Sequence, residues 1–206
     1  MIAGLRRAFR LARWFVTLEI GIWRSLFLWV TRRVPGRRPG VETFAYSRDI
    51  VPILAAISAV STVELVVVHV LLPWETIRLI ADVISIWGLL WMLGLLASLR
   101  VFPHLVADDA LHVRYGTTVD VAVPWEAVAS VTARRRGGVT SRKSVWVDGA
   151  VVTVAVLKQT RVDVVLREPT RLELPDGPET VTEVRLYVDN PRAFVTAARE
   201  RIPIPR

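Results

Sequence analysis

The sequence predicts an α+β membrane protein, and three features of the chain lead to this fold class. Two apolar stretches, residues 50–72 and 76–99, are 23 and 24 residues long. A basic amphipathic segment at 3–33 precedes them, and short Val-rich runs separated by turn residues follow from Val101 onward. These patterns favour a helical first half and a β-rich second half. The expected divisions are an amphipathic interfacial helix with its linker at 1–40, a transmembrane helical hairpin at 41–100, and a cytoplasmic β domain at 101–206.

Each apolar stretch is long enough to cross a lipid bilayer as a helix. At ~1.5 Å rise per residue, a helix needs roughly 20 apolar residues to cross ~30 Å of hydrocarbon. Only Pro73, Trp74 and Glu75 join the two stretches. Because so short a connection makes consecutive helices antiparallel neighbours, we expect a two-helix transmembrane hairpin.

Residues 3–33 are expected to form one amphipathic helix that lies in the membrane interface. At 100° per residue, large apolar side chains occupy one side of this helix and a sector of about 120° is polar or small. That sector contains Arg6, Arg7, Arg10, Arg13, Thr17, Gly21, Arg24, Ser25 and Thr31. An apolar face beside an arginine-lined face is typical of interfacial helices. A third span at 14–30 stays open as an alternative, although it would be 17 residues long and hold two charges.

The arginines around the hairpin predict its orientation in the cell (inner) membrane. Arg32, Arg33, Arg37, Arg38 and Arg48 precede the first apolar stretch, and Arg100 follows the second. The turn between the stretches carries almost no positive charge. Positively charged flanks stay in the cytoplasm, so we expect a multi-pass protein with both termini cytoplasmic and only the 73–75 turn on the far side.

Composition narrows the expected partners. The formal net charge of +8 would suggest nucleic acid in a soluble protein, but no recognition motif accompanies the basic runs, so no nucleic acid is expected. The runs flank or follow apolar segments, which favours anionic lipid. Of the 27 basic residues only Lys143 and Lys158 are lysines, a ratio typical of GC-rich genomes such as those of actinobacteria. The absence of cysteine excludes disulfides and thiolate metal sites.

Ionisable side chains inside the apolar stretches are the first candidates for a partner interface. Glu64 and Asp82 lie at about the same distance along their helices from the 73–75 turn. His69 and Arg78 lie at a second, shorter distance from it. Arg78 and Asp82 are also four residues apart on one helix and can pair. Such residues face protein or water and indicate function. A cluster satisfied within the hairpin, an interface with another membrane subunit, and a proton or substrate path are the alternatives, although two helices alone cannot enclose a path.

Glu19 is a further candidate, because it projects from the apolar face that Trp23 helps to form. An unpaired carboxylate among lipid tails is costly. Either Glu19 reaches the headgroup layer or becomes protonated there, or a partner subunit supplies a cation or a hydrogen-bond donor. The predicted partner interface therefore consists of Glu19, Trp23, Glu64, His69, Arg78 and Asp82.

The second half of the chain is expected to be mainly antiparallel strands. Asp148-Gly149 and Lys158-Gln159-Thr160 indicate tight connections. A final helix is expected at 192–202, after the capping sequence Asp189-Asn190-Pro191. The expected strands are 104–107, 111–115, 119–123, 128–134, 144–147, 151–157, 161–167, 171–174 and 183–188.

This region resembles bacterial pleckstrin-homology (PH)-like domains, which often follow paired transmembrane helices. The resemblance covers roughly 101–202 and rests on Leu105-Val-Ala-Asp-Asp-Ala-Leu-His-Val-Arg-Tyr-Gly116, Val123-Pro-Trp-Glu-Ala-Val128 and Tyr187-Val-Asp-Asn-Pro-Arg-Ala-Phe194. It implies a partly open antiparallel β-barrel closed by one helix. It does not imply phosphoinositide binding.

A basic run within this domain is the candidate contact with anionic lipid. It contains Arg134, Arg135, Arg136, Arg142 and Lys143. Each charge near an anionic leaflet adds ~1 kcal/mol of attraction. A solvated loop is the alternative.

No residue pattern predicts catalysis. The sequence has none of the nucleophile, phosphate-binding or zinc motifs that common enzyme classes share. His104 and His112 could in principle join a metal site, but Asp108-Asp109 between them is more typical of a turn. We therefore expect no catalytic residue, no metal and no cofactor.

These observations together favour a non-enzymatic accessory or stabilising subunit of a larger membrane complex. The specific hypothesis is an actinobacterial multi-subunit lipid importer, with integral membrane subunits and anionic lipid as partners. A PH-like membrane protein that senses anionic lipid and a self-associating membrane scaffold are the alternatives.

The predicted orientation can be tested by cysteine labelling, since the chain has no native cysteine. In whole cells, an impermeant thiol reagent is expected to modify a cysteine placed at Glu75 and to leave one placed at Asp176 unmodified. The reverse pattern would show that the orientation is wrong.

Overall fold

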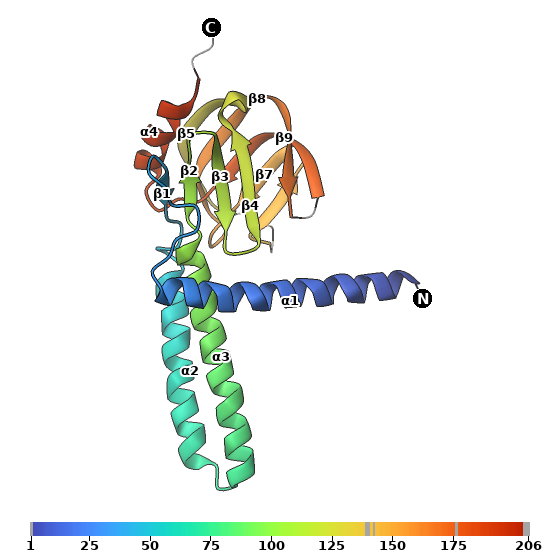
Figure 1. The fold of residues 1–206 in the computed structure, drawn as a ribbon, viewed down its shortest axis with the longest axis vertical. Coiled ribbons are helices and arrows are strands. Elements are labelled where there is room, and N and C mark those ends of the chain that lie inside the picture. Colours follow the sequence, from blue (N-terminus) through green and yellow to red (C-terminus); the bar gives the residue numbers. More distant parts are fainter. Residues whose placement is uncertain (1, 139–140, 142, 176, 204–206) are drawn as a thin grey trace. The chain divides into compact units, whose positions relative to one another are not determined.

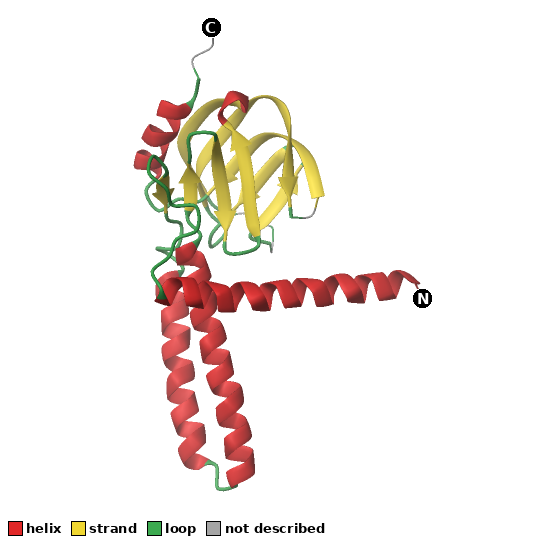
Figure 2. Cartoon of the chain, in the orientation of Figure 1, coloured by secondary structure: helices red, strands yellow, loops and turns green. Residues whose placement is uncertain are grey.

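The structure consists of a helical unit and a β-rich unit (Figures 1 and 2). This computed structural model describes residues 2–203 apart from 139, 140, 142 and 176, and it describes side chains from Phe15 onward. Arg142 and Asp176, both named above, lie outside the described residues. The described part contains four α-helices and nine strands, so the predicted α+β class is confirmed. The helical unit comprises 1–33 and 51–101, and the β-rich unit 34–50 and 102–206.

The helical unit contains the two long apolar helices that the sequence predicts. Its helices are α1 (Ile2–Val30), α2 (Val51–Leu71) and α3 (Glu75–Val101). Figure 1 shows α2 and α3 side by side as an antiparallel hairpin, and they contact each other. By length and composition, both are able to cross a membrane. No residue of α2 is buried within the chain, and α3 buries residues only near its C-terminal end.

Helix α1 packs on α3 at small residues. Ile22 and Ser25 of α1 are 1% and 0% exposed, and Gly94, Ala97 and Ser98 of α3 are buried. A Cβ atom added at Gly94 would lie 2.9 Å from the Ile22 carbonyl oxygen, closer than Cβ contacts normally come. Glycine at this position therefore permits the close approach of the two helices.

The strands of the β-rich unit form two sheets, and no closed barrel is found among the described residues. The first sheet has the order β1-β2-β3-β4 and the second has the order β5-β8-β9-β7-β6. A 3₁₀ turn at Trp125–Ala127 joins the two sheets along the chain. The strands are β1 (Glu42–Phe44), β2 (His104–Val106), β3 (Ala110–Tyr115), β4 (Val119–Pro124), β5 (Val128–Arg136), β6 (Val145–Asp148), β7 (Val151–Val154), β8 (Thr160–Leu174) and β9 (Gly177–Leu186).

The expectation of antiparallel strands needs two corrections. β7 pairs with β9 in parallel, so the unit is not purely antiparallel, and β8 is a single strand where the sequence suggested two. A tight turn at Leu157-Lys158 connects β7 to β8 in the chain. β9 then folds back along β8 and lies between β8 and β7, which makes β9 parallel to β7. The predicted Asp148-Gly149 turn does join β6 to β7 as a hairpin.

The core of the β-rich unit lies between the two sheets. Val119, Val121 and Val123 of β4 are buried while the residues between them are exposed, which is the alternation of a half-buried strand. The last helix, α4 (Pro191–Arg201), packs against β5 and β8. The Asn190 side chain caps α4 by accepting a hydrogen bond from the Ala193 amide, so the predicted helix and its N-cap are confirmed.

The segment 34–50 belongs to the β-rich unit, whereas the expected divisions split it between a linker and the hairpin. Phe44 of β1 makes an edge-to-face ring contact with Phe194 at 5.1 Å. The buried Tyr46 hydroxyl accepts a hydrogen bond from the Gly116 amide at 2.7 Å. A buried aromatic ring with a satisfied hydroxyl fixes a segment firmly, so 34–50 is a docked part of this unit.

The end of this segment is also tied to the β-rich unit. Asp49 accepts hydrogen bonds from the Tyr187 hydroxyl at 2.5 Å and from Arg161 at 2.8 Å. The Arg161 guanidinium lies 4.5 Å from the centre of the Tyr187 ring. Asp49 is therefore held, shortly before α2 begins, by one group from β8 and one from the residue that follows β9.

Candidate membrane and partner interface

The hairpin brings together two of the four ionisable residues predicted to form a polar layer. His69 Nδ1 lies 2.7 Å from Asp82 Oδ2, which links α2 to α3. The sequence suggested Arg78 as the partner of Asp82, but the rotation of the two helices directs Asp82 to His69 instead. Asp82 Oδ1 is buried and has no hydrogen-bond partner among the described residues. The pair therefore satisfies one carboxylate oxygen and leaves the other without a donor.

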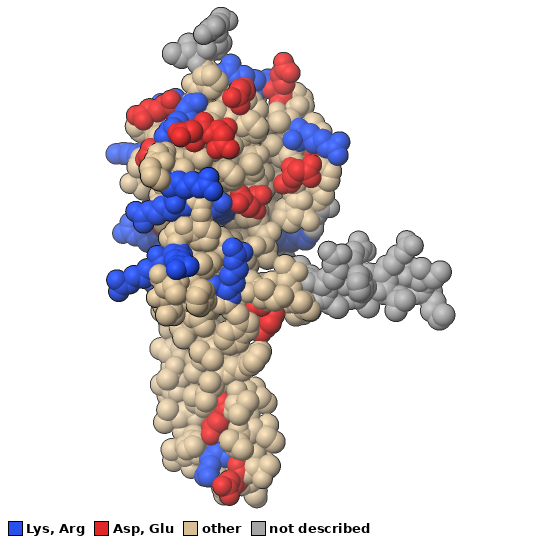
Figure 3. All heavy atoms as spheres, in the orientation of Figure 1, with Lys and Arg blue, Asp and Glu red and all other residues tan. Residues whose placement is uncertain are grey.

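The other two ionisable residues are not paired within the described chain. Glu64 is exposed on α2, and Arg78 is half-buried on α3. Neither side chain makes a hydrogen bond or ion pair with another residue that the structure describes. Figure 3 shows the hairpin as a largely uncharged surface on which only a few charged side chains appear. Glu64 is therefore an isolated carboxylate on an apolar helix.

Glu19 receives its hydrogen bonds from this chain rather than requiring another subunit. The indole N–H of Trp23 donates to Oε1 at 2.8 Å, and that of Trp91 donates to Oε2 at 3.0 Å. Trp23 also makes an edge-to-face contact with Trp87 at 5.3 Å. The expectation that Glu19 needs a partner's donor is thus replaced by an internal arrangement. The four-residue spacing of Glu19 and Trp23 could have predicted the first bond, but no local pattern indicates Trp91.

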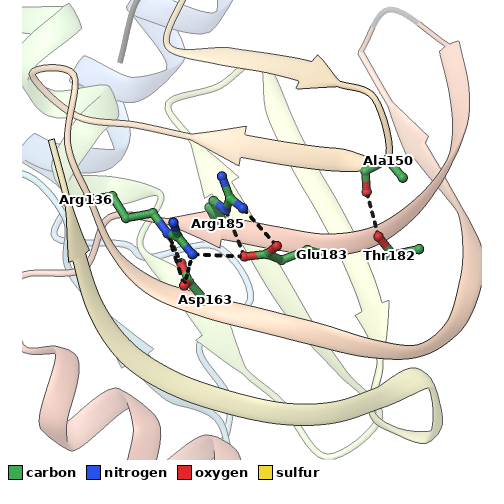
Figure 4. Close-up of polar contacts among 6 residues, drawn as sticks. All are labelled: Arg136, Ala150, Asp163, Thr182, Glu183 and Arg185. Carbon is green, nitrogen blue, oxygen red and sulfur yellow. Dashed lines mark hydrogen bonds and ion pairs between the residues drawn. The ribbon is translucent and has the colours of Figure 1, made fainter. Parts of the chain in front are cut away.

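The described part of the basic run contains three exposed residues and one half-buried residue, Arg136. Arg134 and Arg135 at the end of β5 are exposed, and so is Lys143. Arg136 is different, because its guanidinium binds the Asp163 carboxylate with a shortest distance of 2.9 Å (Figure 4). Arg142 lies outside the described residues.

The Arg136–Asp163 pair is part of a four-residue ion network on β5, β8 and β9 (Figure 4). Arg136 also lies 3.8 Å from Glu183, which forms a two-pronged pair with Arg185 at 2.8 and 3.0 Å. Asp163 is only 3% exposed. The hydrogen bond from Arg185 and the positive charges of Arg136 and Arg134 lower the pKa of Glu183 below its ordinary value. Arg136 therefore neutralises carboxylates of its own domain.

His104 has a structural role in the β-rich unit. Its Nδ1 accepts a hydrogen bond from the Arg114 amide at 3.0 Å, so the proton must reside on Nε2, which donates to the Tyr187 carbonyl at 3.0 Å. Burial lowers the pKa of His104 to about 4. The imidazole therefore stays neutral at physiological pH and crosslinks β2, β3 and the end of β9.

The two histidines do not meet at a metal site. His112 points to Asp120 at 3.0 Å, and Asp108-Asp109 forms the turn between β2 and β3. Among the described residues there is no group of three or more His, Cys, Asp or Glu side chains that could hold a metal ion.

Comparisons with family models, curated proteins and solved structures find no match to this chain. Function is therefore inferred from the geometry of the hairpin and of the β-rich unit.

Replacing Arg136 with alanine is expected to destabilise the β-rich unit. The change leaves the buried Asp163 carboxylate without its hydrogen-bonded cation, a loss on the order of 3 kcal/mol in the free energy of unfolding. Arg134→Ala is the matched control, because Arg134 is exposed on the same strand. Urea unfolding of the full chain in detergent, followed by hydrogen exchange of β8 peptides, measures both variants. Equal effects of the two substitutions would contradict the structural role of Arg136.

Acidification is expected to lower the free energy of unfolding of the β-rich unit, because His104 is buried as a neutral imidazole. Its pKa in the folded protein, about 4, lies below the ordinary 6.5, so the unfolded chain binds the proton more readily. The stabilising contribution is complete above pH 6.5 and is lost as the pH falls toward 4, by about 3 kcal/mol. Hydrogen exchange of β2 and β3 amides as a function of pH measures this loss. His104→Gln should flatten the pH dependence in this range, and a pH dependence that this variant leaves unchanged would contradict the role of His104.

Proposed function

We propose that this protein is a non-enzymatic accessory subunit of a larger membrane complex, anchored in the membrane by the α2–α3 hairpin. The exposed apolar surface of the hairpin supports the anchor. Val60, Val63, Ile80 and Ile84 have exposed fractions of 55 to 68%. A core helix of a soluble domain buries such residues, whereas α2 buries none. Contiguous apolar surface of this extent favours lipid or membrane protein as its environment.

The observation that carries the subunit proposal is the isolated carboxylate of Glu64. Glu64 lies seven residues before the end of α2, or about 10 Å along the helix. An ionised carboxylate without a partner is costly in hydrocarbon. Since the described chain provides no donor, a donor or cation from a neighbouring membrane protein would remove this cost. Arg78 requires an acceptor for the same reason, and the two residues together mark the proposed contact surface.

The β-rich unit supports this role as a binding module without chemistry of its own. Its buried histidine and ion network are satisfied internally, and the described residues bring no catalytic groups together. The resemblance to PH-like domains and the arginine-rich composition favour a cytoplasmic module of an actinobacterial protein. A multi-subunit lipid importer is the specific host that we propose.

Binding of anionic lipid by the β-rich unit is the second candidate function. The exposed side chains of Arg134, Arg135 and Lys143 favour it, because they lie at the end of β5 and in the segment that follows. Arg135 makes one contact, to Gln159 at 3.3 Å, which is long for a hydrogen bond. The exposure of these side chains lets them reach an anionic leaflet.

Replacing Glu64 with leucine tests the subunit proposal. The tagged full chain is purified from its native membranes in mild detergent, and co-purifying proteins are quantified by mass spectrometry. We expect a loss on the order of tenfold in the proteins retained at fixed ratio, because an unpaired donor in a buried interface costs roughly 1–3 kcal/mol. Glu64→Gln should retain more of them, since the amide still accepts a hydrogen bond.

The matched control is Val63→Leu, which introduces a leucine at an exposed neighbour on α2 without removing a charge. Wild-type recovery of every retained protein with Glu64→Leu would contradict the proposal. Retention of anionic lipid without any protein would favour the second candidate, and a homomultimer would favour a membrane scaffold.

A further inference from the structure

Contact with α3 divides the exposed surface of α1 into two unlike flanks. At 100° per residue, the buried side at Ile22 and Ser25 separates an apolar flank from a polar flank. The apolar flank consists of Val16, Trp23 and Val30, and the polar flank contains Thr17, Arg24 and Thr31. Ile20 and Phe27 lie between the two flanks, on the side away from α3. Gly21 and Ser25, which the sequence placed in the polar sector, are buried at the contact instead. The helix therefore presents an apolar surface, with Val16 58% and Val30 72% exposed, that α3 does not cover.

Contacts within the helical unit fix the direction in which the apolar flank faces. Trp23 contacts Trp87, and the adjacent Glu19 binds Trp91. Both α3 tryptophans lie between Gly94, where the helices cross, and Glu75, where α3 begins. The apolar flank of α1 therefore faces along α3 toward the α2–α3 turn. The polar flank, on the opposite side, faces the C-terminal end of α3.

The crossing point lies at a level that matches the edge of a bilayer. Gly94 follows Glu75 by 19 residues, which corresponds to about 28 Å along α3. The hydrocarbon layer of a membrane is ~30 Å thick. Figure 1 shows α1 running across α3 rather than alongside it. If α3 crosses the membrane, α1 thus meets it at the boundary between hydrocarbon and headgroups, where tryptophan side chains are enriched.

From these contacts we infer that the apolar flank of α1 is a lipid-binding surface whose occupant is the acyl chains of one leaflet. The helix lies in the plane of the leaflet at the Arg100 end of the hairpin. Its Val16 and Val30 side chains enter the acyl chains, and Arg24 lies among the phosphate headgroups, as in interfacial helices. This inference rests on the proposed membrane-spanning hairpin, and it excludes the alternative in which 14–30 forms a third span.

Spin labels at single cysteines test the inference in the full chain. The chain has no native cysteine, so one label each can be placed at Val30, Arg24 and Ile84. The protein is reconstituted in vesicles of phosphatidylethanolamine and phosphatidylglycerol in equal amounts. Oxygen reaches labels in hydrocarbon, and a water-soluble nickel complex reaches labels outside it. We expect a severalfold higher ratio of oxygen to nickel accessibility at Val30 than at Arg24, and the highest ratio at Ile84 in the middle of α3.

The label at Ile84 separates failure of this inference from failure of the proposed function. A high ratio at Ile84 with equal ratios at Val30 and Arg24 would overturn the orientation of α1 and leave the hairpin intact. High ratios at all three positions would instead indicate a third span. A low ratio at Ile84 would overturn both the membrane-spanning hairpin and the inference that rests on it.

Discussion

The apolar surface of the α2–α3 hairpin is the constraint on which the rest of the protein depends. A connection of three residues between Leu71 and Glu75 makes the two helices neighbours, but each helix can cover only one side of the other. Side chains such as Val60 and Ile84 therefore stay exposed. In hydrocarbon every polar group on this surface needs a partner. The chain meets that demand at Glu19, where α1 crosses α3, and in part at the His69–Asp82 pair, which leaves one carboxylate oxygen without a donor among the described residues. The described residues offer no donor to the Glu64 carboxylate. A neighbouring membrane protein is therefore the proposed source of that donor.

Local patterns in the sequence predicted the helices well and the pairing of their polar side chains poorly. Apolar length and periodicity are properties of one segment, so α1, α2, α3 and α4 were all expected close to their observed bounds. The partner of Asp82 depends on the rotation of α2 against α3, which counting residues from the turn does not determine. Trp91 lies 72 residues from Glu19, and Arg136 was read as one member of a basic run although its partner Asp163 lies 27 residues away.

The β-rich unit shows the same division between local and long-range information. The Asp148-Gly149 turn and the Asn190 cap depend on a few adjacent residues and were predicted. The parallel pairing of β7 with β9 depends on where β9 returns after β8, which no neighbouring residues specify. The docked segment 34–50 contains only a three-residue strand, too short for a periodic signal. Alternation of Phe44 and Tyr46, both of which contact the β-rich unit, was the available sequence signal.

Photolabelling from within the bilayer tests most directly whether the hairpin spans a membrane. The wild-type chain is reconstituted with a phospholipid that carries a photoreactive diazirine at the end of one acyl chain, and the labelled residues are identified by mass spectrometry. Residues 60–63 and 84–87 lie about 12–18 Å from the turn ends of α2 and α3, near the middle of a ~30 Å layer. The account predicts labelling concentrated at these residues and little in the 72–74 turn or in the β-rich unit. Labelling spread equally over the β-rich unit and the hairpin, or absent from 60–63 and 84–87, would contradict it.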